Sequence, residues 1–371
     1  MKRGFEEVVL LTGFPSFPAR KMLEALLRSG PRTFVHAVVR SKFADEAEEA
    51  RMELTFDERR RVNLLEGDAA SMDLGLSGKE YKELAGEIDR IHHVAHVSYL
   101  GAERKVAEAV NVGGAREIVE LAECSPNLKA LVFHSTALVS GNRTGLVRED
   151  DLDLSRGFKN PIEETRAHAE AFVQRRAKKL PIVVLRPTTV VGDSKTGEVD
   201  RFDGPYLLVL LMLTSPPDLA LPLPGRGDAL LRLVPIDYVV RAARAIGLDR
   251  RAVGRTFHIA DPAPLPARRV FELVARAGGR PAPRGFIPAN LTKAILKTPG
   301  LDRIAQSPRA FLEALATPVQ YSTANTTELL VDTDVRCPPF ESYVDTVVEY
   351  VAHRLREKRA RRDHEAPDPL G

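Results

Sequence analysis

An apolar run that stops at a glycine and then restarts opens the chain. Residues 7–12 read Glu-Val-Val-Leu-Leu-Thr, Gly13 follows, and apolar positions resume at helical spacing within residues 21–27. This order predicts a buried strand, a tight turn and a helix. Free N–H groups at the start of such a helix are typical of a phosphate-binding turn.

The turn keeps only part of the glycine pattern that is typical of dinucleotide-binding proteins. Gly13 occupies the first glycine position, whereas Ser16 and Ala19 occupy the other two. Alanine is tolerated at the last position, but a serine Cβ lies where the backbone approaches the pyrophosphate closely. Two interpretations stay open, a dinucleotide site and an ordinary strand–turn–helix without a ligand. The candidate cofactor contacts of this turn are Gly13, Phe14, Pro15, Ser16 and Phe17.

Apolar runs separated by helical segments continue through the first half of the chain. This alternation predicts repeated βαβ units and an α/β fold of the Rossmann type, with a doubly wound parallel sheet. The expected further strands are residues 33–40, 62–68, 90–97, 128–135, 182–187 and 256–260. The expected helices between them are residues 44–60, 79–87, 102–124 and 161–179.

The character of the sequence changes after residue 190, where proline and glycine become frequent. We therefore expect a dinucleotide-binding domain formed by residues 1–190 and 232–262. A smaller substrate lobe with a C-terminal helix is expected from residues 191–231 and 263–355. Residues 356–371 mix basic and acidic side chains and are expected to be a disordered tail.

Composition excludes several classes of protein. The chain has 54 basic and 51 acidic residues in 371, and this near balance argues against a nucleic-acid-binding surface. Cys124 and Cys337 are too few for a disulfide framework or a cysteine metal site, so no metal is expected. The longest apolar run, residues 206–213, is too short to cross a bilayer, and no signal peptide precedes the first strand. We expect a cytoplasmic protein.

Arg40 ends the second expected strand and bears on the choice of cofactor. An acidic residue at this place holds the ribose 2′-hydroxyl of NAD, whereas a basic residue accommodates the 2′-phosphate of NADP. Arg40 therefore favours NADP(H) over NAD(H). The alternative, a solvated arginine at the end of a strand, stays open.

Several short motifs, in this order, resemble the extended short-chain dehydrogenase/reductases, and within them the fatty acyl-CoA reductases and thioester reductase domains. The resemblance covers roughly residues 6–355 and implies reduction of an acyl thioester or related carbonyl with NADPH. It places Asp68 near the adenine, lets Asn111 steady the central strands, and gives Thr136 a hydrogen bond to the substrate oxygen. The motifs are Thr12-Gly13, Gly67-Asp68, His93-Val-Ala95, Asn111-Val, Ser135-Thr136, Leu185-Arg-Pro187, Val190-Val-Gly192-Asp and Val234-Pro-Ile-Asp237. Ala95, Pro187 and Val190 are further expected cofactor contacts.

The segment that resembles the catalytic helix lacks the proton donor of that family. The family uses a tyrosine, and a lysine four residues later lowers the pKa of that tyrosine and holds the ribose. Ile162 stands in place of the tyrosine and Arg166 in place of the lysine. Arginine can hold ribose hydroxyls but cannot relay a proton, because its pKa is too high.

Two hypotheses about function follow from these departures. In the first, the chain is a reductase in which Thr136 orients the carbonyl, Arg166 holds the ribose, and His96 or water gives the proton. Tyr99 is a further candidate donor, and a structural role is the alternative for His96. In the second, the chain is a non-catalytic binding or regulatory protein. The sequence assigns neither the substrate nor the oligomeric state.

Overall fold

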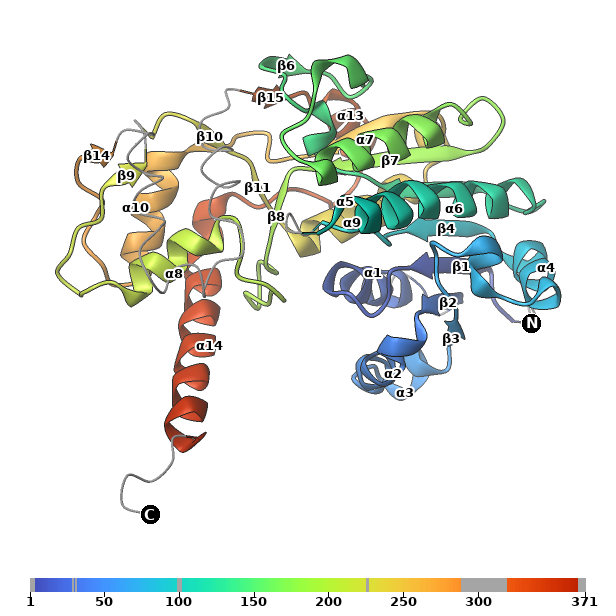
Figure 1. Ribbon diagram of the computed structural model, residues 1–371, viewed down its shortest axis with the longest axis horizontal. Coiled ribbons are helices and arrows are strands. Elements are labelled where there is room, and N and C mark those ends of the chain that lie inside the picture. Colours follow the sequence, from blue (N-terminus) through green and yellow to red (C-terminus); the bar gives the residue numbers. More distant parts are fainter. Residues whose placement is uncertain are drawn as a thin grey trace. The chain divides into compact units, whose positions relative to one another are not determined.

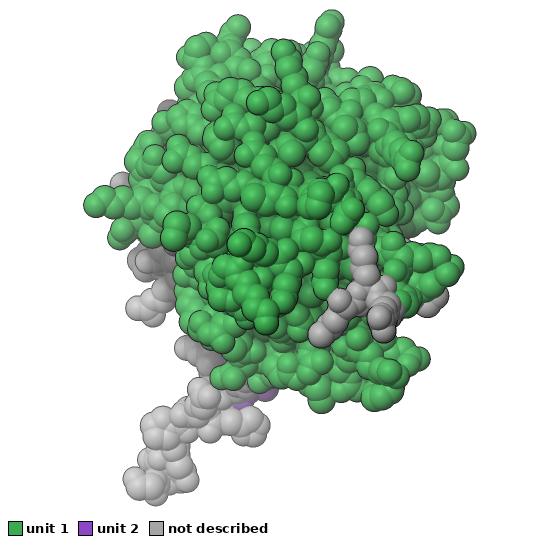
Figure 2. Space-filling view, turned by 90° about the vertical axis from the view of Figure 1, so that its right-hand side faces the viewer, with its two compact units in different colours: residues 1–188, 238–260, 319–336 green, residues 189–237, 261–318, 337–371 purple. Residues whose placement is uncertain are grey.

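The computed structural model describes residues 4–28, 30, 32–98, 102–224, 227–287 and 319–365. The chain forms two compact units (Figure 1). Unit 1 comprises residues 1–188, 238–260 and 319–336, and unit 2 comprises residues 189–237, 261–318 and 337–371. In Figure 2 the residues of unit 1, drawn in green, form one continuous surface.

A seven-stranded parallel sheet forms the centre of unit 1, which confirms the predicted Rossmann-type α/β fold. The strand order is β12-β7-β5-β4-β1-β2-β3. The strand order reverses at β1: β2 and β3 lie on one side of it, and β4 and the later strands lie on the other. Ligands of such sheets bind at this switch point, outside the carboxyl ends of the strands. The strands are β1 (Glu7–Thr12), β2 (Thr33–Val39), β3 (Val62–Glu66), β4 (Arg90–His93), β5 (Ala130–His134), β7 (Ile182–Pro187) and β12 (Thr256–Ile259).

Helices cover both faces of this sheet. Alternate residues of a strand point to opposite faces, and Val8 and Leu10 pack on one face with Ile118 of α6. On the other face α9 approaches closely: a Cβ on Gly247 would lie 2.9 Å from Val132 Cγ2. The helices are α1 (Phe17–Arg28), α2 (Ala44–Met52), α3 (Phe56–Arg59), α4 (Gly78–Glu87), α5 (Arg104–Ala107), α6 (Gly114–Glu123), α7 (Pro161–Gln174) and α9 (Ile236–Leu248).

A segment from the C-terminal part of the chain returns to unit 1. Residues 319–336 lie with the sheet, which differs from the expectation that all of residues 263–355 belong to the lobe. The reason is a long-range strand pairing, because β15 runs parallel to β6. The elements concerned are β6 (Gly145–Val147), β15 (Val319–Tyr321) and α13 (Ala324–Leu330).

A buried carboxylate holds this returning segment. Glu149 is 3% exposed and accepts hydrogen bonds from the backbone N–H groups of Asn325 at 2.7 Å and Thr326 at 3.2 Å. It also accepts the N–H of His258 on β12 at 3.1 Å. One side chain therefore joins the start of α13 to the edge strand of the sheet.

Unit 2 has a hydrophobic core of its own. Tyr206 of α8 packs there with Phe271 of α10 and Val347 of α14, and its hydroxyl accepts the N–H of Gly192 at 2.6 Å. Its elements are β8 (Thr189–Val191), α8 (Tyr206–Thr214), β9 (Leu223–Pro224), β10 (Leu230–Leu231), β11 (Leu233–Pro235), β13 (Leu265–Pro266), α10 (Ala267–Ala277), β14 (Phe286–Ile287) and α14 (Val344–Glu365).

Helix boundaries differ from the sequence prediction in several places, and one of them is the end of α7, which lies at Gln174 and not at residue 179. The helix expected over residues 44–60 breaks at Thr55, which starts α3 with a capping box. The helix expected over residues 102–124 contains a π-helical turn at Glu108–Gly113. The tail expected from residue 356 is helical through Glu365, because α14 continues that far. Among the described residues, no helix is long and apolar enough to cross a membrane.

Candidate functional site

The turn after β1 is held against the end of β4. Gly13 has a φ of +88°, and a Cβ there would lie 2.8 Å from the backbone nitrogen of Ala95. The hydroxyl of Thr12 accepts the N–H of Ala95 at 3.1 Å. Only glycine combines this backbone conformation with so close an approach. The glycine that the sequence retains is therefore required by the contact between two strand ends.

The rest of this turn is closed to solvent except at Ser16. Phe14 and Phe17 are 3% and 5% exposed, so their rings pack into the protein. Ser16 is exposed, directly before α1. Pro15 and Pro18 carry no N–H, so this turn offers two fewer backbone donors than the turns that bind phosphate in other proteins.

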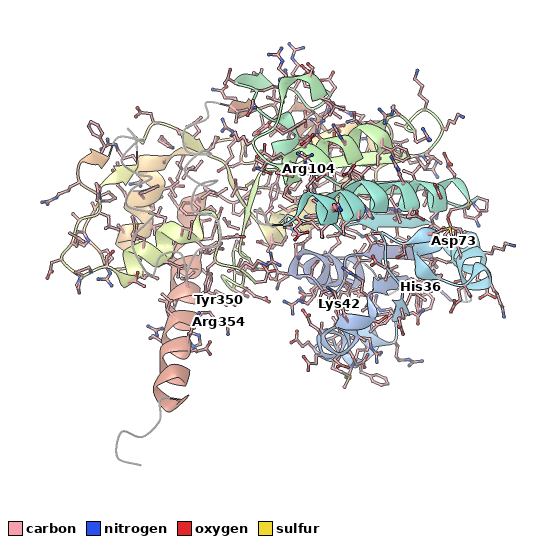
Figure 3. All side chains as sticks on the ribbon, in the orientation of Figure 1. His36, Lys42, Asp73, Arg104, Tyr350 and Arg354 are labelled. Atoms are coloured by element: carbon pink, nitrogen blue, oxygen red, sulfur yellow. The ribbon has the colours of Figure 1, made fainter. Side chains whose placement is uncertain are left out.

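A pocket of about 470 Å³ lies at the carboxyl ends of β2 and β3, where the adenosine of a dinucleotide binds in this fold. Arg40 Nε lies 3.0 Å from Asp68 Oδ2, and Ser41 Oγ donates to Glu66 Oε1 at 2.6 Å. The pocket is lined by Arg40, Ser41, Lys42, Glu66, Gly67, Asp68 and Gly75. Figure 3 labels Lys42, which follows the end of β2. The structure thus brings the expected residues Arg40 and Asp68 together.

A left-handed turn fixes the position of Asp68. Its backbone N–H donates to the carbonyl of Leu74 at 2.8 Å, and its Oδ1 accepts the N–H of Ala70 at 3.0 Å. Asp73 and Leu74 have φ values of +51° and +58°, a region that costs free energy for residues other than glycine. Because Leu74 is fully buried, its side chain holds this conformation in place.

Asn111 links the loop after β4 to α7. Its Oδ1 accepts the N–H of Val97 at 2.8 Å, and its Nδ2 donates to Thr165 Oγ1 at 3.0 Å. The residue lies within the π-helical turn that interrupts the long helix. Turns of this kind occur often at functional sites. Asn111 orders the loop that follows Ala95 and His96.

Thr136 lies just beyond the end of β5, next to a buried ion pair. Thr136 Oγ1 accepts the N–H of Leu138 at 3.3 Å. The preceding residue, Ser135, donates its hydroxyl to Glu170 of α7. Glu170 is fully buried and pairs with Arg186 of β7, whose Nη2 lies 2.5 Å from Glu170 Oε1. Through Arg186 and Ser135, Glu170 ties α7 to β7 and to the segment that follows β5.

Ile162 and Arg166, the residues that the sequence compares with the tyrosine and lysine of the family, lie in the first two turns of α7. Asn160 caps the helix by accepting the N–H of Ile162 at 3.1 Å, and the Ile162 side chain is 5% exposed. Arg166 is also 5% exposed and donates from Nη2 to the backbone carbonyl of His134 at 3.0 Å. Burial lowers the pKa of Arg166 to about 10, so the guanidinium keeps its charge near neutral pH.

Histidines surround Arg166 and stay neutral. Burial, followed by the charge of Arg166, lowers the pKa of His134 to about 3 and holds the pKa of His96 far below its ordinary value. Within the described part of the chain, His96 Nδ1 is buried and has no hydrogen-bond partner. A neutral imidazole is a weak proton donor, so these surroundings do not favour His96 as the general acid. Tyr99 lies outside the described residues.

Acid is expected to destabilise the fold through these imidazoles. Burial lowers the pKa of His93 and His134 to about 3, whereas an unfolded histidine titrates near about 6.5. Below about pH 6.5 the unfolded state therefore binds more protons, and the free energy of unfolding falls by up to about 1.4 kcal/mol per pH unit for each histidine. Urea unfolding at stepped pH values measures this slope. It should shrink in His134→Gln and persist in His168→Gln, which changes an exposed histidine; equal slopes in both variants would contradict this account.

The remaining expected contacts lie on two units. Pro187 ends β7 in unit 1, beside Ile259 of β12. Val190 belongs to β8 in unit 2. The sequence did not single out Glu170, Glu149 or Glu66, although each carboxylate organises a part of the site or its support. Glu170 lies four residues, one helical turn, after Arg166, and this spacing is the sequence signal that could have identified it. For Glu149 and Glu66, only the fold reveals the partners.

The residues present fit a nicotinamide dinucleotide over most of its length. The open pocket at Arg40 and Asp68 suits the adenosine, and Gly13 keeps the turn close to the strand ends. Thr136 follows the end of β5, and Arg166 of α7 donates to the carbonyl of His134, the last residue of that strand. The two prolines of the turn leave it with fewer backbone N–H donors for a pyrophosphate.

Comparison with known proteins gives the family. Residues 11–243 match the sequence model of an NAD-binding family that is described as male sterility protein. The chain is 27% identical over 282 residues to "Fatty acyl-CoA reductase wat" of Drosophila melanogaster, covering 65% of this chain and 54% of that protein. It is 26% identical over 370 residues to a linear gramicidin synthase of Brevibacillus parabrevis, covering 93% of this chain and 7% of that protein.

A solved structure is similar over almost the whole chain. The terminal R domain from the myxalamid PKS-NRPS biosynthetic pathway superposes with a TM-score of 0.79 at 25% identity, covering 94% of this chain and 91% of that one. The chain spans about half the length of the fatty acyl-CoA reductases it matches. The chain belongs to the male sterility protein family, within the extended short-chain dehydrogenase/reductases and their fatty acyl-CoA reductase-like branch.

Proposed function

We propose that this chain binds NADP(H) and slowly reduces an acyl thioester or a related carbonyl. The observation that carries the proposal is the position of Thr136 at the end of β5, where its Oγ1 accepts the N–H of Leu138. That bond uses a lone pair of the oxygen and not the hydroxyl hydrogen, so the hydroxyl can still donate to a carbonyl oxygen. The relatives named as fatty acyl-CoA reductases support this class of substrate.

The chain's own residues divide the work as follows. Arg40 and Lys42 attract the 2′-phosphate, and the Asp68 loop shapes the adenosine pocket. Arg166 keeps a positive charge that holds ribose hydroxyls. Thr136 stabilises the negative charge that grows on the substrate oxygen. When bound, the nicotinamide supplies the hydride.

The proton source makes the reaction slow in this proposal. Ile162 has no proton to give, and neutral His96 is a weak acid. Water then protonates the oxygen that Thr136 holds. A positioned general acid contributes about 10²–10⁴-fold to such a rate, and the chain forgoes this factor.

A second candidate is a non-catalytic NADP(H)-binding protein. Two observations favour it. Ile162 fills the donor position with a buried apolar side chain, and Arg166 is bonded to the His134 carbonyl. In this case the chain senses or holds the nucleotide without turnover.

Stopped-flow oxidation of NADPH with panels of acyl-CoA thioesters and aldehydes separates the two candidates. Slow turnover is expected in the wild type, with a loss of about 10²-fold in Thr136→Ala because a donor to the growing negative charge is removed. Turnover no faster than that of Thr136→Ala would reject the reductase. If the wild type binds NADPH but shows no such turnover, the result supports the second candidate, a non-catalytic NADP(H)-binding protein.

A further inference from the structure

The adenosine pocket holds two carboxylates beside its cationic groups. Arg40 and Lys42 contribute positive charge, and Glu66 and Asp68 contribute negative charge to the same lining. A pocket dedicated to a phosphate group usually has an excess of positive charge. Here the formal charges cancel, which limits the attraction for a phosphate at the ribose.

The two carboxylates differ in how they are held. Asp68 faces Arg40 at 3.0 Å and is fixed by the N–H of Ala70. Glu66, the last residue of β3, is exposed and accepts the Ser41 hydroxyl at 2.6 Å. Among the described residues, no cation lies within 4.0 Å of the Glu66 carboxylate. Its negative charge therefore remains uncompensated by a direct ion pair.

We propose that Glu66 is a selectivity residue that weakens binding of a nucleotide with a 2′-phosphate and leaves binding of a nucleotide with a 2′-hydroxyl unchanged. This inference rests on the proposed function, because it requires a dinucleotide in this pocket. It assigns a discriminating role to the pair of Glu66 and Ser41, beside the cationic residue that attracts the phosphate.

Two physical effects act in the same direction. A 2′-phosphate that lies next to Ser41 carries a charge of about −2 and is a close neighbour of the Glu66 carboxylate. Like charges that are close neighbours repel each other even near the protein surface. Glu66 also takes up the Ser41 hydrogen that a phosphate oxygen would accept. A ribose hydroxyl is neutral and can donate to a carboxylate, so it meets neither obstacle. Glu66 therefore reduces the ratio of NADPH affinity to NADH affinity that Arg40 creates.

Isothermal titration calorimetry with NADPH, NADH, 2′,5′-ADP and 5′-AMP tests the inference on the full chain. Glu66→Gln removes the charge and is expected to tighten binding of NADPH and 2′,5′-ADP about tenfold. Binding of NADH and 5′-AMP should stay within about twofold. Glu66→Ala also frees the Ser41 hydroxyl, so its gain should be at least as large.

Glu83→Gln is the matched control, because it removes an equal charge from an exposed residue of α4 that lies outside the pocket lining. Glu83→Gln should leave the affinity for nucleotides with a 2′-phosphate and for nucleotides with a 2′-hydroxyl unchanged. If the wild type binds nucleotides but Glu66→Gln leaves the ratio of NADPH to NADH affinity unchanged, the selectivity role is wrong and the proposed function stands. If neither the wild type nor any variant binds a nucleotide, both are overturned.

Discussion

Ile162→Tyr combined with Arg166→Lys is expected to raise the rate of NADPH-dependent reduction by about 10²–10⁴-fold, which is the usual contribution of a positioned general acid. The tyrosine gives its proton to the substrate oxygen, and the lysine one turn later lowers the pKa of that tyrosine. Both positions lie in the first two turns of α7, whose start is fixed by the Asn160 cap. The measurement is the steady-state rate with an acyl-CoA thioester and an aldehyde.

A variant of equal bulk isolates the hydroxyl. Ile162→Phe with Arg166→Lys places a ring of the same size without a proton to donate, so its rate should stay at the wild-type level. A double variant with tyrosine that is no faster than this phenylalanine control would show that the site has lost more than its acid.

Loss of the buried ion pair between Glu170 and Arg186 is expected to cost about 3–5 kcal/mol of the free energy of unfolding. Glu170→Ala leaves the Arg186 guanidinium, which is 1% exposed, without its carboxylate partner. The same substitution removes the acceptor for Ser135 and the partner of Gln174, 2.8 Å away. Urea unfolding of wild type and variant measures the difference.

Glu123→Ala is the control for this ion pair. Its partner Arg176 lies 3.4 Å away, and both side chains are about as accessible as ordinary surface groups, at 46% and 40% exposed. Pairs of this kind contribute about 0–1 kcal/mol. A second variant, Glu170→Met with Arg186→Met, removes both charges and should recover part of the lost stability. Equal losses in Glu170→Ala and Glu123→Ala would refute the role of the buried pair.

The parallel sheet and the approximate positions of its strands followed from local pattern, because buried parallel strands are short apolar runs between helices; the order of the strands came from the structure. Two boundary errors also had a local signal. Thr55 and Glu58 form a capping box, which the sequence displays as a threonine followed three residues later by a glutamate. The extension of α14 is supported by pairs such as Arg354 with Glu357, which lie on one helix face.

Long-range contacts explain what the sequence left unpredicted. Arg40 and Asp68 follow different strands, and only the parallel register of β2 and β3 brings them within 3.0 Å. Glu149 meets Asn325 across 176 positions of the chain, so the return of the C-terminal segment has no local signal. The sequence already showed Ile162 where the resemblance expects a tyrosine, but the contact of Arg166 with the His134 carbonyl required the fold.

Calorimetric titration of NADPH into the wild type and Arg40→Ala tests the central proposal, that the chain binds a dinucleotide although Ile162 stands where the resemblance expects a tyrosine. The account predicts saturable binding to the wild type and at least about tenfold weaker binding to Arg40→Ala, because a charged hydrogen bond to phosphate is lost. NADH should bind both proteins equally. Absence of NADPH binding to the correctly folded wild type would contradict the account.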